Sequence, residues 1–453
     1  MPASCPSGRP IPTWDFGLSS RIALGEASLV HGNAGLPLAS ARRYRRDGWR
    51  RGFTRRRMHG GASRRPIPAR VSLGGRMLIS HVEARLVRVP VARPTRMATR
   101  VLGQRDYVLA TIRADDFEGV GYCYAGTSGG AVVREAIRSD LAPVLVDADA
   151  EDIAGAWDRM YQETLLSGRR GAVLRAMSAI DVGLWDLLAR RCGLPLAVLL
   201  GGGRGAVAAY ASGGYYRPED DVTAAEQVAA EIRDNQRLGF ADHKIKVGGL
   251  APELDAERVA AAADVIGGHG RLALDANNAY RTVKEAMRAM RMFQDAAAST
   301  ELWWIEEPLV PDDIAGHAEL ARRLETPVGT GEIAQTRWEF RQLIEQKAAD
   351  ILQPDAGVLG GVSEWIRTAR TAESFGIPVA PHWHANLHVH LAAASSNCIA
   401  VEHFALEKDI YNFETLVTPE TRTEVRDGTL IVPDRPGLGI EFDPAQVRKF
   451  TVD

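Results

Sequence analysis

Beyond Met77, the chain opens with three stretches in which apolar and polar residues alternate as in half-buried strands. These are LISHVEARLVRVPV, DYVLATIRAD and GVGYCYAG, and the turns between them predict an antiparallel meander. Apolar residues at spacings of three and four then predict helices around 132–145, 153–166 and 175–191. Residues 77–203 are therefore predicted to form a small α+β domain, which ends at the Gly-rich segment GLPLAVLLGGGRG.

After Gly203, short apolar strands alternate with amphipathic helices, the pattern of parallel βα units. The candidate strands are AVAAYAS, HKIKVG, RLALDAN, WWIEEP, PVGTGE, ILQPDAG, IPVAPH and IAVEHF. Eight strands in about 200 residues suit a closed TIM-type barrel, here predicted over 204–404. An open doubly wound sheet is the alternative, but no G-x-G-x-x-G opens a helix after the first strand. The segment 405–453 contains GTLIVPDRPGLGIEFD, a predicted hairpin, and is expected to pack on the first domain.

The composition fits a soluble globular protein with a large core and a second domain, since 45% of the 453 residues are hydrophobic and 25% are charged. No segment approaches the roughly 20 apolar residues of a membrane helix, and the start lacks the apolar stretch of a secretory signal. We therefore expect a cytoplasmic protein with no membrane partner. Cys5, Cys123, Cys192 and Cys398 form no C-x-x-C pair, which predicts free thiols.

Charge is distributed unevenly, because residues 1–76 hold 15 arginines, no lysine and 3 acidic residues, which leaves about −14 for the remainder. This stretch could be a nucleic-acid-binding arm or a targeting segment. It could also be a disordered extension, or non-coding sequence read from an upstream start codon, with the true start at Met77. We favour the last two interpretations, because no aromatic platform or folded motif accompanies the arginines.

Seven consecutive predicted strands end in residues able to do chemistry. These are Lys244 with Lys246, then Asp275, Glu306, Glu332, Asp355, His382 and Glu402. Their spacings of 31, 31, 26, 23, 27 and 20 residues each match one βα repeat. All should therefore meet at the C-terminal mouth of the barrel, where active sites of this fold lie. A strand-end cap or salt bridge would explain any one of them, but not seven in phase.

Asp275, Glu306 and Glu332 come from three successive strands and bring no cysteine or histidine with them. Carboxylate oxygens suit a hard cation such as Mg²⁺, whereas zinc normally recruits histidine or cysteine. Without a metal, three clustered carboxylates would raise one another's pKa. The sequence therefore predicts a magnesium site here, with three independent surface acids as the alternative.

Lys244 and Lys246 lie two apart on a strand, so both side chains should point into the mouth. Only six of the 55 basic residues are lysines, so the chain uses arginine wherever positive charge suffices. A lysine whose pKa is lowered by burial and by like charge can act as a base, and arginine cannot. We predict that each lysine lowers the pKa of the other. A pair of solvated strand-edge lysines is the alternative.

Asp355 and His382 end adjacent strands, so the carboxylate could orient the imidazole and raise its pKa, giving a second acid or base across the mouth. Glu402 could donate a hydrogen bond to a developing oxyanion if burial keeps it protonated. The nearby His384, His388 and His390 are interpreted as helix or loop residues, because only His382 is at the strand-end position.

The motifs K-I-K, D-A-N, W-I-E-E-P, G-E, P-D with GVLGGV, A-P-H and V-E resemble, in order, the mandelate racemase subgroup of the enolase superfamily. The resemblance covers residues 77–453. It implies a modified (β/α)7β barrel with an α+β capping domain whose loop, at Arg93 to Arg105, closes the mouth. It also implies a homo-oligomer and a small carboxylate substrate.

The same resemblance assigns roles to the strand-end residues. Asp275, Glu306 and Glu332 would bind Mg²⁺, Lys246 would be the base, Lys244 would assist it, and Asp355 with His382 would serve the other face. Glu402 would be the electrophile at a carboxylate oxygen, and Asn277 would contact the metal-bound substrate. Residues that could read substrate hydroxyls or a distal carboxylate are Arg96, Arg100, Tyr215, Tyr216 and Tyr280.

Differences between this sequence and other branches of the superfamily narrow the range of expected activities. Asp355 has no lysine partner, unlike cycloisomerases and dipeptide epimerases of the superfamily, and Glu332 is not the asparagine of glucarate dehydratases. K-I-K also disfavours the galactonate and mannonate dehydratase types. Dehydration of a sugar acid or hydroxy diacid to a 2-keto-3-deoxy acid is the favoured activity, and racemisation or epimerisation of a 2-hydroxy acid is the alternative. A non-catalytic binding module with a nucleic-acid-binding arm is the less favoured interpretation.

Overall fold

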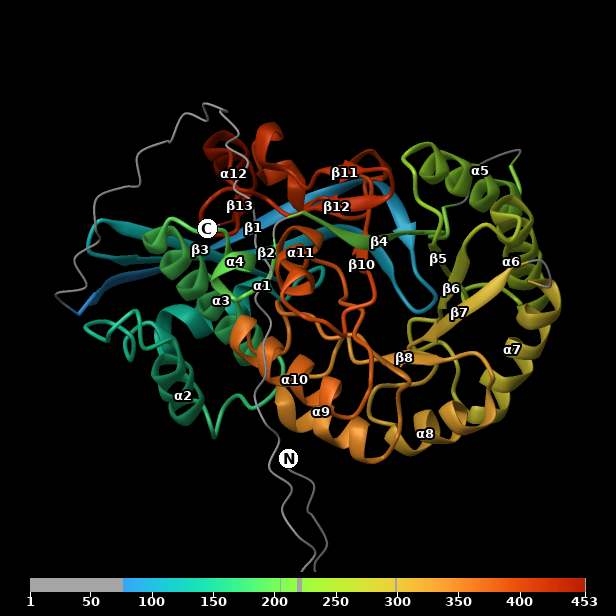
Figure 1. The fold of residues 1–453 in the computed structure, drawn as a ribbon, viewed down its shortest axis with the longest axis horizontal. Coiled ribbons are helices and arrows are strands. Elements are labelled where there is room, and N and C mark those ends of the chain that lie inside the picture. The colour runs from blue at the N-terminus through green and yellow to red at the C-terminus, as the bar shows by residue number, and fades with distance from the viewer. Residues whose placement is uncertain (1–75, 204, 218–221, 298–299, 453) are drawn as a thin grey trace, which may run out of the picture. The chain divides into compact units, whose positions relative to one another are not determined.

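The computed structural model describes residues 76–203, 205–217, 222–297 and 300–452 (Figure 1). The Arg-rich stretch predicted over residues 1–76 therefore lies outside the described residues, except for Arg76. Cys123, Cys192 and Cys398 are free thiols, as predicted. No helix in the described ranges is long and apolar enough to cross a bilayer.

An antiparallel sheet of order β13-β1-β2-β3 forms the first part of the fold. Its strands are β1 (Ile79–Arg96), β2 (Val101–Ala114), β3 (Phe117–Tyr124) and β13 (Thr451–Val452). The meander of the first three strands agrees with the sequence pattern. The chain's C-terminal strand pairs with β1, with Leu86 opposite Val452, so the end of the chain returns to this sheet.

Helices α1 (Gly130–Glu135) and α3 (Ala172–Cys192) lie against this sheet. Two others, α2 (Ile153–Glu163) and the short α4 (Leu196–Leu199), pack on α3. The first predicted helix is shorter than expected, because α1 widens into a π-helical turn that ends at Leu141. The long α3 lies directly against β3, where a Cβ at Gly121 would be 1.9 Å from the carbonyl oxygen of Ala179. Only glycine permits this close approach.

The described residues of 206–403 form a closed parallel barrel, which confirms the predicted fold class. Its strands are β4 (Ala206–Gly213), β5 (His243–Lys246), β6 (Arg271–Asp275), β7 (Glu301–Glu306), β8 (Val328–Thr330), β9 (Ile351–Leu352) and β10 (Val401–His403). Pairing runs from β4 through β9, and β10 pairs with β4. Backbone bridges at Val379 take the place of an eighth strand between β9 and β10.

Seven helices follow the strands and surround them (Figure 1). They are α5 (Ala224–Arg237), α6 (Pro252–Ile266), α7 (Val283–Ala296), α8 (Ile314–Arg323), α9 (Thr336–Glu345), α10 (Val362–Ser374) and α11 (Ala385–Ala393). Several begin at side-chain caps: Thr223 and Glu226 form a capping box at α5, and Asp313 accepts from the amide of Gly316 at α8. These caps fix where the loops before α5 and α8 end.

The C-terminal segment carries a small hairpin and a last helix. The hairpin consists of β11 (Val425–Arg426) and β12 (Thr429–Ile431), which pairs with β4, and the helix is α12 (Pro444–Phe450). The hairpin predicted over 428–443 is therefore misplaced. Pro433 and Pro436 lack the amide donors that a second strand after β12 would need.

Asp181 joins the α-helical layer of the first domain to the barrel. It is fully buried in α3, and its two oxygens accept hydrogen bonds from the amide and hydroxyl of Ser363, at 2.9 and 2.6 Å, in the first turn of α10. Burial raises the pKa of Asp181 to about 7, although the two bonds from Ser363 oppose the rise.

We expect Asp181→Asn to remove a pH dependence of stability. Because the carboxyl pKa is about 7 when folded and 3.8 ordinarily, Asp181 favours folding below pH 4, and this contribution is lost as the pH rises through 7. The loss is on the order of 4 kcal/mol. Asparagine can keep both contacts to Ser363 without ionising. The free energy of unfolding of the variant should therefore rise relative to that of the parent between pH 4.5 and 8. Urea midpoints of both proteins measure this, and parallel pH profiles would contradict it.

Candidate active site

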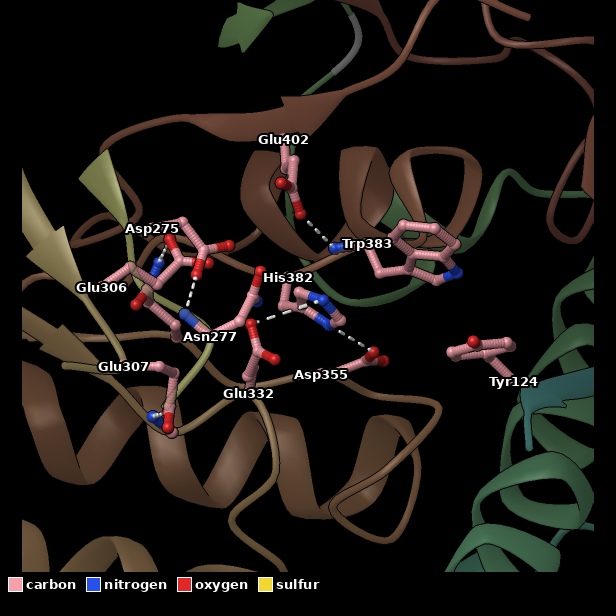
Figure 2. Close-up of polar contacts among 12 residues, drawn as sticks. Tyr124, Asp275, Asn277, Glu306, Glu307, Glu332, Asp355, His382, Trp383 and Glu402 are labelled. Atoms are coloured by element: carbon pink, nitrogen blue, oxygen red, sulfur yellow. Dashed lines mark hydrogen bonds and ion pairs between the residues drawn. The ribbon is translucent and has the colours of Figure 1, made fainter. Parts of the chain in front are cut away.

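Three carboxylates converge at the mouth of the barrel. Asp275 ends β6, Glu306 ends β7, and Glu332 lies two residues beyond β8. One oxygen from each lies within 4.8 Å of the others (Figure 2). Burial raises the pKa of Glu306, and although Lys244 opposes the rise, Asp275 and Glu332 add to it.

This donor set fits Mg²⁺. The ligands are all carboxylate oxygens, and an oxygen of Glu332 and the Oδ1 of Asn277 are buried without a hydrogen-bond partner. Buried polar atoms are rarely left unsatisfied, so these oxygens are available to a cation and its bound waters. Asp275, Glu306 and Glu332 are the residues that would hold the metal.

Lys244 and Lys246 extend from β5 into the barrel, on the same face as expected from strand alternation. The Nζ of Lys244 lies 2.5 Å from Glu306 and 2.7 Å from Glu402, and Lys246 is paired with Asp275. Burial lowers the pKa of Lys246, but Asp275 and Tyr215 outweigh it, so the pKa lies above its ordinary value. Lys244 does lower the pKa of Lys246, as predicted, but the nearby carboxylate and Tyr215 outweigh it, so a net lowered pKa is not found.

Glu402 lies in the middle of β10, the last barrel strand, and is held as a carboxylate. Its oxygens contact Lys244 and accept from the amide of Trp383 at 2.7 Å. Burial raises the pKa of Glu402, but Lys244 and His382 lower it more, so the pKa lies below its ordinary value. Glu402 is therefore not the protonated hydrogen-bond donor that was expected, because Lys244 lies against it. Sequence spacing did not show this contact.

Asp355 and His382 form a dyad beyond β9 and the bridge at Val379. The Nδ1 of His382 lies 3.0 Å from Asp355, and its Nε2 lies 3.5 Å from Glu332 (Figure 2). Burial lowers the pKa of His382, yet Glu332 and Asp355 raise it to about 9 overall. The imidazole side chain is 18% exposed and lines the cavity. The neighbouring carboxylates of Asp355 and Glu332 favour its protonated form.

The other histidines of this segment lie behind the dyad. His384 and His388 are fully buried at the start and in the first half of α11. The Nε2 of His388 accepts from the amide of Ala356 at 3.0 Å, and burial lowers its pKa to about 4. A neutral ring in this position supports the backbone that follows Asp355.

A cavity of about 400 Å³ opens onto these groups. Of the strand-end residues, Lys246, Glu332, Asp355 and His382 line it. Arg100, Tyr215 and Asn277, three of the predicted substrate-binding residues, also line it. Asn277 has a left-handed backbone (φ 43°), and its carbonyl accepts from the hydroxyl of Thr99. Sparsely populated backbone conformations of this kind persist where the surrounding structure enforces them.

Arg96, Tyr216 and Tyr280 are placed elsewhere. Arg96 exchanges backbone hydrogen bonds with Tyr216 and donates to the carbonyl of Gly249 at 2.9 Å. The hairpin between β1 and β2, which includes the predicted closing loop, is thereby fastened to the barrel mouth. Tyr280 is buried and does not line the cavity. Contact of Arg96 or Tyr280 with substrate stays a prediction.

Sequence reasoning assigned no substrate contact to four of the basic and aromatic residues that line the cavity. Arg105 and Tyr124 come from the capping sheet, Arg175 from α3, and Trp383 from the residue after His382. Nothing in the spacing of β2 or α3 marks these residues. Two signals were available: Trp383 follows His382, and Arg105 ends the stretch 93–105 that was predicted to close the mouth.

Comparison with known proteins covers both parts of the chain. Residues 81–201 match the family described as mandelate racemase/muconate lactonizing enzyme, N-terminal domain, and residues 227–446 match enolase C-terminal domain-like proteins. Arabinonate dehydratase of Saccharolobus solfataricus is 36% identical over 72% of this chain and 85% of its own length. L-talarate/galactarate dehydratase of Salmonella typhimurium is 34% identical over 82% of this chain and 91% of its own length.

A solved structure shows the same architecture. The Salmonella typhimurium L-talarate/galactarate dehydratase, liganded with Mg and L-lyxarohydroxamate, superposes with a TM-score of 0.76 and 32% identity. The match covers 86% of this chain and 97% of that chain. The similarity therefore spans the capping sheet as well as the barrel.

Proposed function

This chain belongs to the mandelate racemase/muconate lactonizing enzyme family of the enolase superfamily, and from that premise we propose that it is a magnesium-dependent acid-sugar dehydratase. It takes the proton beside a substrate carboxylate and expels the β-hydroxyl as water, which gives a 2-keto-3-deoxy acid. Arabinonate carries one carboxylate, whereas talarate and galactarate carry two. The relatives therefore leave the far end of the substrate open.

One observation carries the proposal: Lys246 and the His382–Asp355 dyad line the same cavity as Glu332 of the carboxylate triad. An amine base and an imidazole acid are thus both in reach of a carboxylate bound at the triad. Abstraction of a very weakly acidic α-proton requires such a pre-placed base together with charge stabilisation at the carboxylate.

Magnesium held by Asp275, Glu306 and Glu332 would supply Lewis-acid stabilisation of negative charge on the substrate carboxylate, and would offset the carboxylate charge that raises the pKa of Lys246. Lys246 removes the α-proton. Lys244, held between Glu306 and Glu402, places a second positive charge beside the substrate carboxylate. His382, oriented by Asp355, donates a proton to the departing β-hydroxyl.

Dehydration is favoured over racemisation because arabinonate dehydratase and L-talarate/galactarate dehydratase are among the relatives of this chain. In dehydration, His382, oriented by Asp355 at 3.0 Å, protonates the leaving hydroxyl. In the alternative reaction, the same group would return a proton to the α-carbon, and the product would be the inverted acid.

A screen of acid sugars with Mg²⁺ tests the proposed function. We expect at least one acid to give a 2-keto-3-deoxy product that reacts with semicarbazide, with no reaction when EDTA replaces the metal. His382→Asn should lose keto acid formation, because the leaving hydroxyl then has no proton donor. Change of optical rotation without keto acid would identify a racemase or epimerase instead, and no change with any acid would reject both.

Location and assembly are part of the proposal. The free thiols of Cys123, Cys192 and Cys398 support a location in the cytoplasm, where thiols stay reduced. A homo-oligomer remains a prediction.

A further inference from the structure

Arg105 is a buried cation with no acidic partner among the described residues. Its residue surface is 2% exposed, and its hydrogen-bond partner is the hydroxyl of Tyr124 at 3.0 Å. Its Nε is buried without any partner. The adjacent Asp106 does not form an ion pair with Arg105, because Asp106 is paired with Arg88 at 2.7 Å. A buried guanidinium without a carboxylate is costly unless a ligand supplies the missing charge.

The guanidinium is held in place from two sides. It lies 4.4 Å from the ring centre of Trp383 and 5.4 Å from that of Tyr124. Trp383 in turn stacks on His382. It has a left-handed backbone (φ 75°), and its backbone amide donates a hydrogen bond to Glu402. The donors of Arg105 are therefore pre-organised, as bidentate recognition of a carboxylate requires.

The position of Arg105 corresponds to the far end of a substrate. It lines the same cavity as Lys246 and His382, and Arg175, which has no acidic partner among the described residues either, lines that cavity with it. Figure 2 shows the triad carboxylates on one side of His382 and Tyr124, the hydrogen-bond partner of Arg105, on the other. A substrate whose first carboxylate lies at the triad extends past His382 toward Arg105.

We propose that Arg105 forms a distal anion subsite, and that the substrate is consequently a dicarboxylic sugar acid, an aldarate, rather than an aldonate. This inference rests on the proposed function, because it needs the first carboxylate to be bound at the triad. Arg105 acts on specificity and not on the reacting atoms. An aldonate presents a neutral hydroxymethyl group to the guanidinium, and a site built for a charged partner rejects an analogue that leaves its buried donors unpaired.

Pairs of aldarates and aldonates with equal length and stereochemistry test the subsite. We expect the parent to prefer the aldarate of its best pair by about 100-fold in kcat/KM, the effect of a truncated buried charge pair. Arg105→Met should lower aldarate kcat/KM by about 100-fold, mainly through KM, and change the aldonate less than about threefold. Arg105→Lys should retain part of the preference. Arg113→Met, at an exposed arginine further along β2, is the matched control and should leave both rates unchanged.

Binding without turnover separates this inference from the proposed function. Calorimetry on the magnesium-loaded protein compares succinate, glutarate and adipate with the ω-hydroxy acids of the same length. The best dicarboxylate should bind at least about tenfold tighter, and Arg105→Met should abolish the difference. If this holds while no acid is dehydrated, the subsite is supported and only the proposed function fails. Equal binding in the parent, equal turnover of aldonate and aldarate, or an equal loss of both in Arg105→Met overturns the subsite.

Discussion

Lys246→Ala is expected to lower turnover of the acid found in the screen by about 10⁴-fold, while the protein stays folded and binds magnesium. Lys246 is the only lysine that lines the 400 Å³ cavity among the described residues. Lys244 cannot replace it, since its side chain is 1% exposed and is held by Glu306 and Glu402. Keto acid formation measures the rate, and magnesium titration with circular dichroism checks the metal site and the fold.

Lys284→Ala is the matched control for this prediction. Lys284 is exposed in α7, so the same loss of an amine should leave the rate unchanged. Incorporation of deuterium from D₂O at the α-carbon gives a second measurement, because it reports proton transfer even when dehydration is slow. Parent-like turnover by Lys246→Ala would contradict the assigned base.

Glu306→Gln is expected to abolish stabilisation by magnesium and to lower turnover by at least about 10³-fold. Glu306 is the middle ligand of the triad and is buried, so an amide in its place removes a charged donor that water cannot replace. In the parent, magnesium at 100 times its dissociation constant should stabilise the folded state by about 2.7 kcal/mol. Thermal unfolding of EDTA-treated protein, with magnesium added back, measures the difference.

Loss of metal binding in Glu306→Gln can be distinguished from loss of the fold. Lys244 keeps its contact with Glu402 in Glu306→Gln, so its buried charge remains paired and the variant should fold. Glu319→Gln, at a partly exposed carboxylate of α8 that pairs with Arg323, should keep the full magnesium-dependent rise. An equal rise in parent and Glu306→Gln would show that the metal binds elsewhere.

Much of the site could be predicted because barrel strands repeat regularly. In a parallel barrel, residues one βα unit apart return to the same mouth, so spacing alone brought Asp275, Glu306 and Glu332 together. Alternation along β5 likewise placed Lys244 and Lys246 on one face. Both inferences use periodicities of the backbone, which hold whatever the rest of the chain does.

The pKa values of these groups could not be predicted from the sequence in the same way. The pKa of Lys246 and of Glu402 depends on which opposite charge lies within a few ångströms across the barrel. Glu402 lies against Lys244 from a distant part of the chain, and no spacing rule gives that distance. Interaction energies between charges fall with distance and rise with burial, and both quantities follow from packing.

The sequence by itself determined the barrel, the capping meander and the seven strand-end groups, because each follows from a local period or from the repeat length. The tertiary structure alone decided that Arg105 and Tyr124, from the capping sheet, line the cavity beside Trp383. It also decided that Asp275 lies close enough to raise the pKa of Lys246, and Lys244 close enough to lower that of Glu402. These facts depend on how two domains meet and on charges far apart in the chain, and neither leaves a pattern along a single segment.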